Sequence, residues 1–227
     1  MTNISNDTHG MLVTFNLSFR FIDNEKYFLV YLVFAIGEIT IGNALKCQHC
    51  KAVGENDCSG PSLECKNEDD VCVQGIEHNI LDGDKRPTAH RGCFNFMMVC
   101  DQIVTLNTGR FQLNFYNKCC KTDNCNSDPI EMPPPNNTKN GLYCKSCFVE
   151  GSYECETYES VACTCNQGDC MEFTGDATRP GDVEKKNAFA GCATKGACDI
   201  GCKILIGTSV GEVQILRCPL ENIISVK

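Results

Sequence analysis

The sequence predicts an all-β, small, disulfide-rich protein made of two tandem modules. Twenty of its 227 residues are cysteine, and all of them lie between Cys47 and Cys218. Such a density is typical of crosslinked scaffolds in oxidising compartments. The cysteine spacing repeats along the chain, and the segments between cysteines alternate apolar and polar residues as short strands do. We therefore expect an extracellular protein.

Residues 1–44 favour a secretory signal peptide with an atypical polar extension in front of it. Lys26 precedes eleven mostly apolar residues that end at Gly37, and small residues follow Glu38 up to Ala44. This order is typical of a signal peptide. The apolar run falls short of the roughly 20 residues that span a bilayer. We expect cleavage after Ala44; an uncleaved anchor and a buried core helix are the alternatives.

The polar extension leaves the true start codon open, and Met11 is an alternative start. Asn3, Asn6 and Asn16 begin glycosylation sequons inside the segment that is removed, so we expect no sugar on them. The C-terminal tail, residues 220–227, lacks the apolar run of a lipid-anchor signal. We expect a secreted product with no membrane anchor.

Two series of cysteines have matching spacing. From Cys47 the successive steps are 3, 8, 7, 7, 21, 7, 19, 1 and 5 residues. From Cys144, with Cys165 and Cys202 omitted, the steps are 3, 8, 8, 7, 22, 6 and 20. Seven consecutive steps agree within one residue, which indicates an internal duplication. We assign the first module to residues 45–127 and the second to residues 141–219.

A proline-rich linker, residues 128–140, separates the two modules. Its three consecutive prolines, 133–135, favour a short and stiff extended segment. The sequon that begins at Asn136 lies in this segment. Because linkers are exposed and the chain is expected to be secreted, we predict N-glycosylation of Asn136.

Each module is expected to consist of short strands joined by tight turns. Residues 110–116 and 212–217 alternate in polarity, which predicts strands. Three segments contain residues that are typical of tight turns and predict hairpin tips: Asp82-Gly83, Asn107-Thr108-Gly109 and Pro180-Gly181. Modules of about 80 residues bury little apolar area, so crosslinks are a physical requirement for them.

Two segments of the first module resemble the lymphocyte-antigen and urokinase-receptor family. They are Leu45–Cys50 at its start and Cys119–Asn126 at its end. The resemblance implies two tandem three-finger (snake-toxin-like) domains. It also implies these disulfides: Cys47–Cys72, Cys50–Cys58, Cys65–Cys93, Cys100–Cys119, Cys120–Cys125, Cys144–Cys170, Cys147–Cys155, Cys163–Cys192 and Cys198–Cys218.

Cys165 and Cys202 depart from the family pattern. Unpaired exposed thiols are liabilities in an oxidising space. We therefore expect Cys165 and Cys202 to form an extra bridge in the second module, with an intersubunit crosslink as the alternative.

A secreted tandem whose second module lacks the Cys-Cys ending is similar to the gamma-type phospholipase A2 inhibitors of blood plasma. The similarity implies a non-enzymatic protein that binds a secreted phospholipase A2, blocks its access to substrate and forms a homo-oligomer. The alternative is a secreted receptor-binding or adhesion ligand with no phospholipase target.

Other chemistries are poorly supported by the residues. The net charge of −9 disfavours nucleic acid and anionic membranes as partners. Cys47-x-x-Cys50 and Cys144-x-x-Cys147 have zinc-like spacing, but oxidation removes the thiolates that a metal needs. His78 and His90 lack a nucleophile and are expected to be exposed loop residues, and Asp69-Asp70 is expected to be a solvated turn. We predict no enzyme activity, no cofactor and no metal.

The candidate contact regions are the long fingers: Val73–Arg91 and Met171–Ala190, with Asp101–Lys118 as a third. Loops on a rigid scaffold commonly carry recognition. Phe94–Met98 is apolar, and we expect it to serve in core and inter-module packing rather than in binding a partner. The acidic charge favours basic partners.

Overall fold

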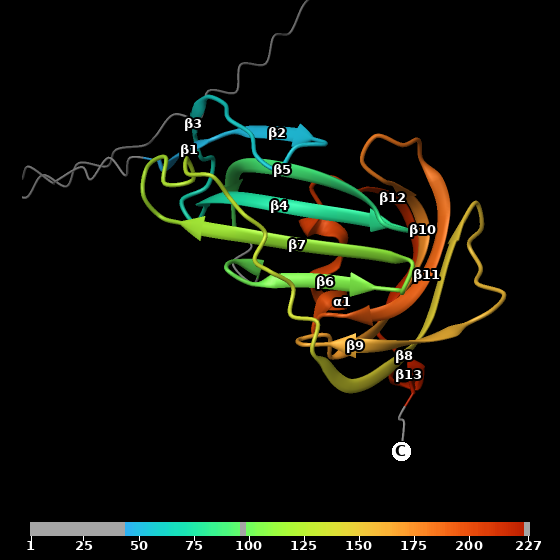
Figure 1. Ribbon diagram of the computed structural model, residues 1–227. Helices are drawn as coiled ribbons and strands as arrows, with labels where there is room; N and C mark the ends of the chain where they lie inside the picture. Colours follow the sequence, from blue (N-terminus) through green and yellow to red (C-terminus); the bar gives the residue numbers. More distant parts are fainter. Residues whose placement is uncertain (1–43, 96–98, 225–227) are drawn as a thin grey trace, which may run out of the picture. The chain divides into compact units, whose positions relative to one another are not determined.

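β-Strands make up most of residues 44–95 and 99–224, which are the residues that the computed structural model describes (Figure 1). The expected signal peptide lies outside them except for Ala44, and so do residues 96–98 of the expected packing segment and residues 225–227. Within the described ranges, no helix is long and apolar enough to cross a membrane. The predicted all-β, disulfide-rich fold class is confirmed.

The first module has three hairpin-like fingers, and both turns predicted in it are confirmed. Asp82 and Gly83 adopt positive φ angles of 48° and 88° between the two strands of the long second finger. Gly109, with φ of 88°, lies in the turn of the third finger. The strands are β1 (Lys46–Gln48), β2 (Cys50–Val53), β3 (Ser62–Glu64), β4 (Val71–Leu81), β5 (Asp84–Phe94), β6 (Ile103–Asn107) and β7 (Phe111–Cys120).

The second module repeats the first two fingers and changes the third. A short helical segment precedes the last long strand, where the sequence predicted no helix. Pro180 and Gly181 form the turn of the second finger, as predicted. The elements are β8 (Lys139–Glu150), β9 (Glu159–Thr164), β10 (Asp169–Thr178), β11 (Lys185–Ala193), α1 (Ala197–Ile200), η2 (Gly201–Ile204), β12 (Ser209–Arg217), η3 (Leu220–Asn222) and β13 (Ile223–Ile224).

A single sheet runs through both modules. Its strand order is β12-β10-β11-β6-β7-β4-β5-β2, and β8 also pairs with β11 (Figure 1). Strand β11 changes partner along its length. It pairs with β8 at residues 187–190 and with β6 of the first module at Cys192 and Ala193. The two modules, over residues 44–95 and 99–224, accordingly form one compact unit rather than two separate ones.

Gly191 allows the two modules to approach at this junction. A Cβ atom at this position would collide with the backbone carbonyl of Asn107 on β6. Glycine, which has no Cβ, permits close backbone approach. The equivalent glycine of the first module, Gly92, would make only ordinary contacts with His49, 3.6 Å away. The requirement for a residue without a Cβ atom at position 191 therefore comes from the docking of the modules and not from the three-finger fold itself.

The hydrophobic core lies mainly between the modules. One cluster combines Val104 and Phe115 of the first module with Ile200 and Ile204 of the second. Another joins residues of β6 and β7 to α1 and the end of β11. Two smaller clusters are formed by cystines, one in each module. Each module alone would leave its largest apolar surface in water, so docking supplies the burial that stabilises both.

Nine disulfides are present among the described residues, and they coincide with the nine pairs that the resemblance implies. Every pair lies within one module. The linker residues 129–138 have no regular structure, and β8 begins at Lys139. Because every disulfide lies within one module, no cystine joins the two modules within the described part of the chain.

The expected bridge between Cys165 and Cys202 is absent, and both residues are free cysteines in the structure. Cys165 is exposed in the turn after β9, where its backbone amide donates to Thr138 of the linker. Cys202 is half-buried in η2 beside the inter-module core. The expected Cys165–Cys202 bridge was wrong because the spacing between cysteines does not show where the altered third finger places its extra cysteine.

Candidate functional site

The three candidate contact regions are only partly exposed. In Val73–Arg91, residues 73–79 of β4 are buried, because β5 and β7 flank the strand and the second module covers it. In Asp101–Lys118, one face of β6 and β7 lies in the inter-module core and contributes Val104, Leu106, Phe111, Leu113 and Phe115. Met171–Ala190 keeps an exposed tip around Val183, which is 75% exposed. The first module thus uses much of its fingers to hold the second.

Glu77 is the polar centre of this docking. Its side chain is fully buried on β4, and its carboxylate accepts hydrogen bonds from the backbone amides of Ile206, Gly207 and Thr208 at 2.8–2.9 Å. The hydroxyl of Thr208 donates to the same carboxylate at 2.5 Å. A buried carboxylate is tolerated only when donors surround it. This contact fixes the third finger of the second module against the first.

The tips of the two second fingers also bind each other. Arg86 of the first module donates to Asp182 at 2.6 Å and to the carbonyl of Pro180 at 2.8 Å. In the opposite direction, Arg179 donates to Asn79 at 2.7 Å. These side chains are partners of each other, so they do not form a free surface.

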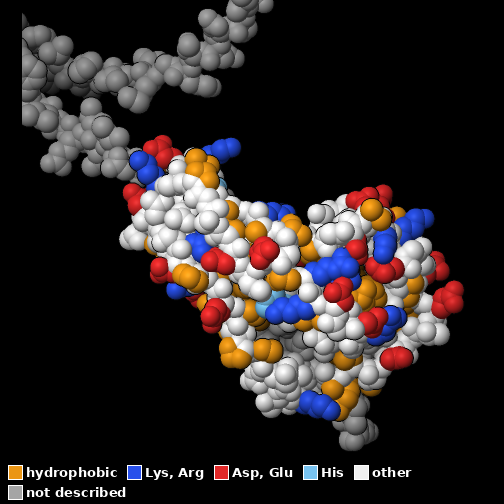
Figure 2. All heavy atoms as spheres, turned by 45° about the horizontal axis from the view of Figure 1, so that its top comes forward, with side chains coloured by type: hydrophobic (Ala, Val, Ile, Leu, Met, Phe, Trp, Pro, Cys, Tyr) orange, Lys and Arg blue, Asp and Glu red, His pale blue; other side chains and the backbone are white. Residues whose placement is uncertain are grey.

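Five acidic residues of the second module define what we call its acidic face: Glu154, Glu156, Asp176, Glu184 and Glu212. They come from all three fingers of the module, and all except Asp176 are exposed. Three large apolar side chains on the same fingers are exposed, namely Tyr158 (48%), Val183 (75%) and Val213 (43%). Figure 2 shows Asp and Glu side chains next to Lys and Arg side chains, with hydrophobic ones between them, at the right of the view, the side on which β10, β11 and β12 lie in Figure 1.

Tyr153 lies at the centre of the acidic face. Its hydroxyl donates to Asp176 at 2.7 Å, and Lys186 lies over its ring at 4.9 Å from the centroid. The hydrogen bond to Asp176, followed by burial and the nearby charges of Glu212 and Glu184, raises the pKa of Tyr153 to about 12. Carboxylates of the second and third fingers therefore act on one tyrosine of the first finger.

Sequence reasoning missed the contribution of the first finger to this surface. The candidate regions included the second finger of the second module but not residues 151–158. Glu150, Glu154, Glu156 and Glu159 lie within ten residues. A count of charge by finger, rather than over the whole chain, would have identified this segment.

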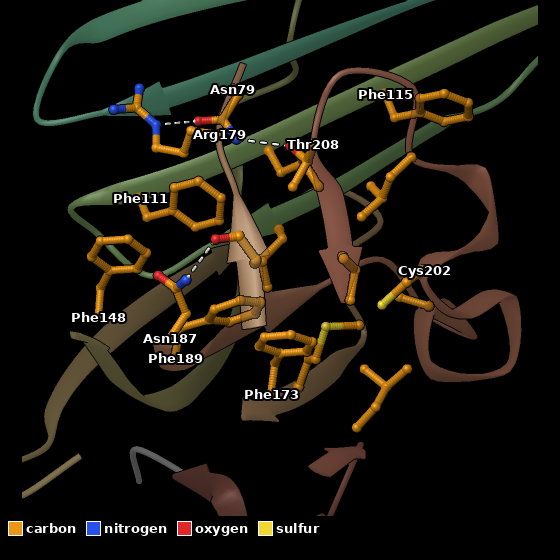
Figure 3. Close-up of a pocket in the computed structure, with 18 of the residues that line it drawn as sticks. Asn79, Phe111, Phe115, Phe148, Phe173, Arg179, Asn187, Phe189, Cys202 and Thr208 are labelled. Atoms are coloured by element: carbon orange, nitrogen blue, oxygen red, sulfur yellow. Dashed lines mark hydrogen bonds between the residues drawn. The ribbon is translucent and has the colours of Figure 1, made fainter. Parts of the chain in front are cut away.

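An apolar cavity of about 90 Å³ lies between the modules (Figure 3). Phenylalanines from both modules line it, together with aliphatic residues of η2 and β12. The polar side chains at its edge are paired: Asn79 donates to Thr208 at 2.9 Å, and Asn187 donates to the carbonyl of Ala177 at 3.1 Å. None of the unpartnered buried polar atoms found in the described residues belongs to its lining. The cavity is therefore suited to an apolar occupant.

The histidines of the second finger are not the exposed loop residues that the sequence predicted. His78 lies on β4 and is 7% exposed, and His90 lies half-buried on β5. The pKa of each is lowered to about 4, mainly by burial and, for His78, also by the nearby charge of Lys85. The expectation was wrong because the hairpin continues as regular strands up to the Asp82-Gly83 turn. Both imidazoles are neutral at physiological pH.

The other candidate residues have structural surroundings. His49 lies 3.3 Å from the sulfur of Cys93, which is in a disulfide. Asp70 is buried, where a solvated turn was expected, and accepts hydrogen bonds from the backbone and side chain of Asn67. Phe94 packs against the inter-module core, in line with the packing role expected of its segment. The two cysteine triplets close enough to hold a metal consist entirely of disulfide-bonded residues.

The chain is similar in sequence to several known proteins. Residues 43–128 match the family described as the u-PAR/Ly-6 domain. A phospholipase A2 inhibitor gamma chain of Gloydius brevicaudus siniticus is 25% identical over 184 residues, covering 79% of this chain and 89% of that protein. The urokinase plasminogen activator surface receptor of Bos taurus is 27% identical, covering 68% of this chain and 46% of the receptor. The structure of mouse TEX101 covers 80% of this chain and 99% of its own, with 17% identity and a TM-score of 0.36.

Proposed function

Since residues 43–128 form a u-PAR/Ly-6 domain and most of the chain is homologous to gamma-type phospholipase A2 inhibitors, we propose that the protein is a secreted, non-enzymatic inhibitor of a secreted phospholipase A2. It acts by covering the enzyme and blocking access to the lipid substrate. The similarity of several named phospholipase A2 inhibitors supports the class of target.

The acidic face on the three fingers of the second module is the observation that supports our choice of the binding surface. Carboxylates around Tyr153 give it a negative field, and Tyr158, Val183 and Val213 supply apolar contact area. Complementary charge accelerates encounter, while a few buried apolar anchors supply affinity. We therefore assign a basic phospholipase A2 as the preferred target.

The test titrates the purified secreted protein against acidic and basic secreted phospholipases A2 while lipid hydrolysis and direct binding are followed together. Saturable inhibition near one-to-one stoichiometry, with matching direct binding, supports the proposal. Binding to none of the enzymes would contradict it and favour a receptor-binding or adhesion ligand instead.

Charge reversal tests the surface. The double variant Glu154→Lys/Glu156→Lys is expected to slow association with a basic phospholipase about tenfold at low salt, with a smaller difference at high salt. The matched control is Glu68→Lys/Asp69→Lys, which reverses two exposed acidic residues of the first module. Equal effects of the two double variants would show that net charge, and not the acidic face, controls association.

A further inference from the structure

A cleft separate from the apolar cavity lies between the proline-rich linker and the sheet of the first module. Residues 132–137 of the linker line it together with residues of β4, β6 and β7, and the linker crosses β7 and β6 in Figure 1. Residues 164–167 of the second module complete the lining. The cleft has a volume of about 930 Å³. Small-molecule sites in proteins measure roughly 300–1,000 Å³, so the cleft has the size of a ligand site.

The strand register places polar side chains in rows on the floor of this cleft. Glu77 and Asn79 of β4 bind the second module, so the alternate residues His78 and Ile80 face the other side of the sheet. His78 is opposite Asn114 of β7, and the rows continue onto β6. The six residues of two neighbouring rows line the cleft: His78, Asn114 and Thr105 in one, and Ile80, Gln112 and Asn107 in the other.

The floor offers neutral hydrogen-bonding groups that the protein leaves unused. The side-chain amides of Gln112 and Asn114 are not hydrogen-bonded to any residue that the structure describes. His78 is 7% exposed, and its Nε2 atom has no partner among the same residues. A buried polar atom without a partner is costly, and it is commonly satisfied by water or a ligand.

The charges at the cleft do not select an ion. Lys85 and Asp101 are the lysine and the carboxylate of its lining, and both are exposed. Their signs are opposite, whereas a side-chain amide or a neutral imidazole can both donate and accept a hydrogen bond. The cleft therefore fits an uncharged ligand that carries many hydroxyl or amide groups.

Asn136 lies in the wall of this cleft. It begins the one N-x-S/T sequon between Leu45 and Lys227. Its Oδ1 atom accepts a hydrogen bond from the amide of Thr138, while its Nδ2 atom, which a glycan would modify, has no partner in the described part of the chain. A sugar attached to Asn136 therefore starts at the edge of the cleft.

We propose that the first two N-acetylglucosamine residues of a glycan on Asn136 fold back into this cleft. Their hydroxyl and acetamido groups bind Gln112, Asn114 and His78, and their apolar ring faces contact Ile80 and the linker prolines. The proposal rests on the N-glycosylation predicted for Asn136. It does not depend on whether the acidic face binds a phospholipase A2.

The covalent tether makes a weak site sufficient. A ligand on a short linker has an effective concentration on the order of 1 mM at its site, so an intrinsic Kd of about 0.1 mM would keep the cleft occupied about ten times more often than empty. A glycan held in this way is shielded from enzymes that act on its core. Shielding is thus the quantity to measure.

The experiment follows an endoglycosidase that cleaves between the first two N-acetylglucosamine residues. The proteins are secreted by animal cells restricted to high-mannose glycans. The wild type is compared with a control that combines Asn136→Gln with Glu150→Asn, which begins a new sequon with Gly151 and Ser152 at the end of β8, outside the cleft lining. We expect the folded wild type to be cleaved at least about tenfold more slowly than the folded control. The two reduced, unfolded proteins should be cleaved at equal rates.

Intact mass spectrometry separates the two ways in which the proposal can fail. A wild type without a glycan would overturn both the proposal and the glycosylation on which it rests. A wild type with a glycan that is cleaved as fast as the control glycan would overturn the proposal alone.

A double variant tests the floor of the cleft. Gln112→Ala/Asn114→Ala should raise the cleavage rate of the Asn136 glycan to that of the control glycan, with the thermal unfolding midpoint checking that the variant is folded. Gln102→Ala, an exposed amide outside the lining, should leave the wild-type rate unchanged. A folded double variant with the wild-type rate would mean that the linker alone shields the glycan, which contradicts the proposal.

A second measurement needs no substitution. Removal of the glycan from the folded wild type should shift the imidazole NMR signals of His78, which lines the cleft, more than those of His49, which does not. Equal or absent shifts at the two histidines would overturn the proposed contact with His78.

Discussion

Glu77 accepts hydrogen bonds from both the backbone amide and the hydroxyl of Thr208, 131 residues further along the chain. Local structure cannot produce this contact, because the two residues belong to different modules. It requires the third finger of the second module to lie directly against the second finger of the first. The contact therefore reports on the docking of the modules, and its removal tests how much stability docking provides.

Replacing Glu77 by Gln should lower the free energy of unfolding by about 3 kcal/mol. The amide NH₂ group would face backbone N–H donors, and buried donors left without an acceptor cost about 1–3 kcal/mol each. Chemical denaturation of the oxidised protein measures the change. Glu68→Gln, an exposed position, is the control and should change stability by less than about 0.5 kcal/mol. Equal stability of both variants would mean that this contact does not hold the modules together.

Gly191→Ala should destabilise the protein by about 2 kcal/mol, because the added Cβ displaces the carbonyl of Asn107 and opens the junction of β11 with β6. Gly92→Ala changes the equivalent position of the first module, where the added atom has room. We expect less than about 1 kcal/mol there. Thermal unfolding of the pair gives the comparison, and a larger loss for Gly92→Ala would contradict the assigned junction.

The protein should lose stability as the pH falls from 6.5 towards 4. The pKa values of His78 and His90 are lowered to about 4 by burial from an ordinary value of 6.5. Within this window the unfolded chain binds protons that the folded chain does not, so acid favours unfolding. Denaturation midpoints across the window measure the effect. NMR titration should show two imidazoles with a pKa near 4, and ordinary values for both would refute the assignment.

The two free thiols should differ in reactivity. Cys165 is exposed, whereas burial raises the pKa of Cys202 and lowers its thiolate fraction. Mass spectrometry after alkylation should find one adduct in the native protein and two in denaturant without reductant. Cys165→Ser should remove the native adduct. If no adduct appears even in denaturant, the two cysteines are oxidised and the free thiols of the structure are wrong.

Asn136 should carry an N-linked glycan in protein secreted by animal cells. Its side chain is exposed in the linker, where it accepts a hydrogen bond from the backbone amide of Thr138 at 3.0 Å. Treatment with a glycosidase should lower the apparent mass by one glycan, and Asn136→Gln should show no such change. A wild-type mass without sugar would contradict this prediction.

The fingers could be predicted from the sequence because cystines fix them locally. Steps between cysteines determine where each strand starts, and turn residues such as Asp82-Gly83 determine where it reverses. The docking of the modules could not be predicted in this way. Glu77 and Asn79 are polar residues at alternate positions of β4, a pattern that usually indicates a face in water. That face is instead covered by the second module, and nothing local to β4 distinguishes the two cases.

The acidic face and the cavity escaped prediction for the same reason. Tyr153, Asp176 and Glu212 come from three fingers, and Phe111 and Phe173 come from two modules. Their proximity depends on how whole elements pack. The free Cys202 likewise follows from the altered third finger, whose short helix the apolar spacing did not reveal.

Strand β11 forms hydrogen bonds with both β8 and β6, so the proline-rich linker is not the only connection that holds the two modules together. A protease that cut the exposed backbone at residues 134–137 would break the covalent connection between the modules, because no cystine in the described ranges spans it. The sheet, the shared core and Glu77 would still hold the pieces. The nicked protein would migrate as two fragments under denaturing conditions and elute as one particle in native buffer, behaving as a heterodimer of its own halves.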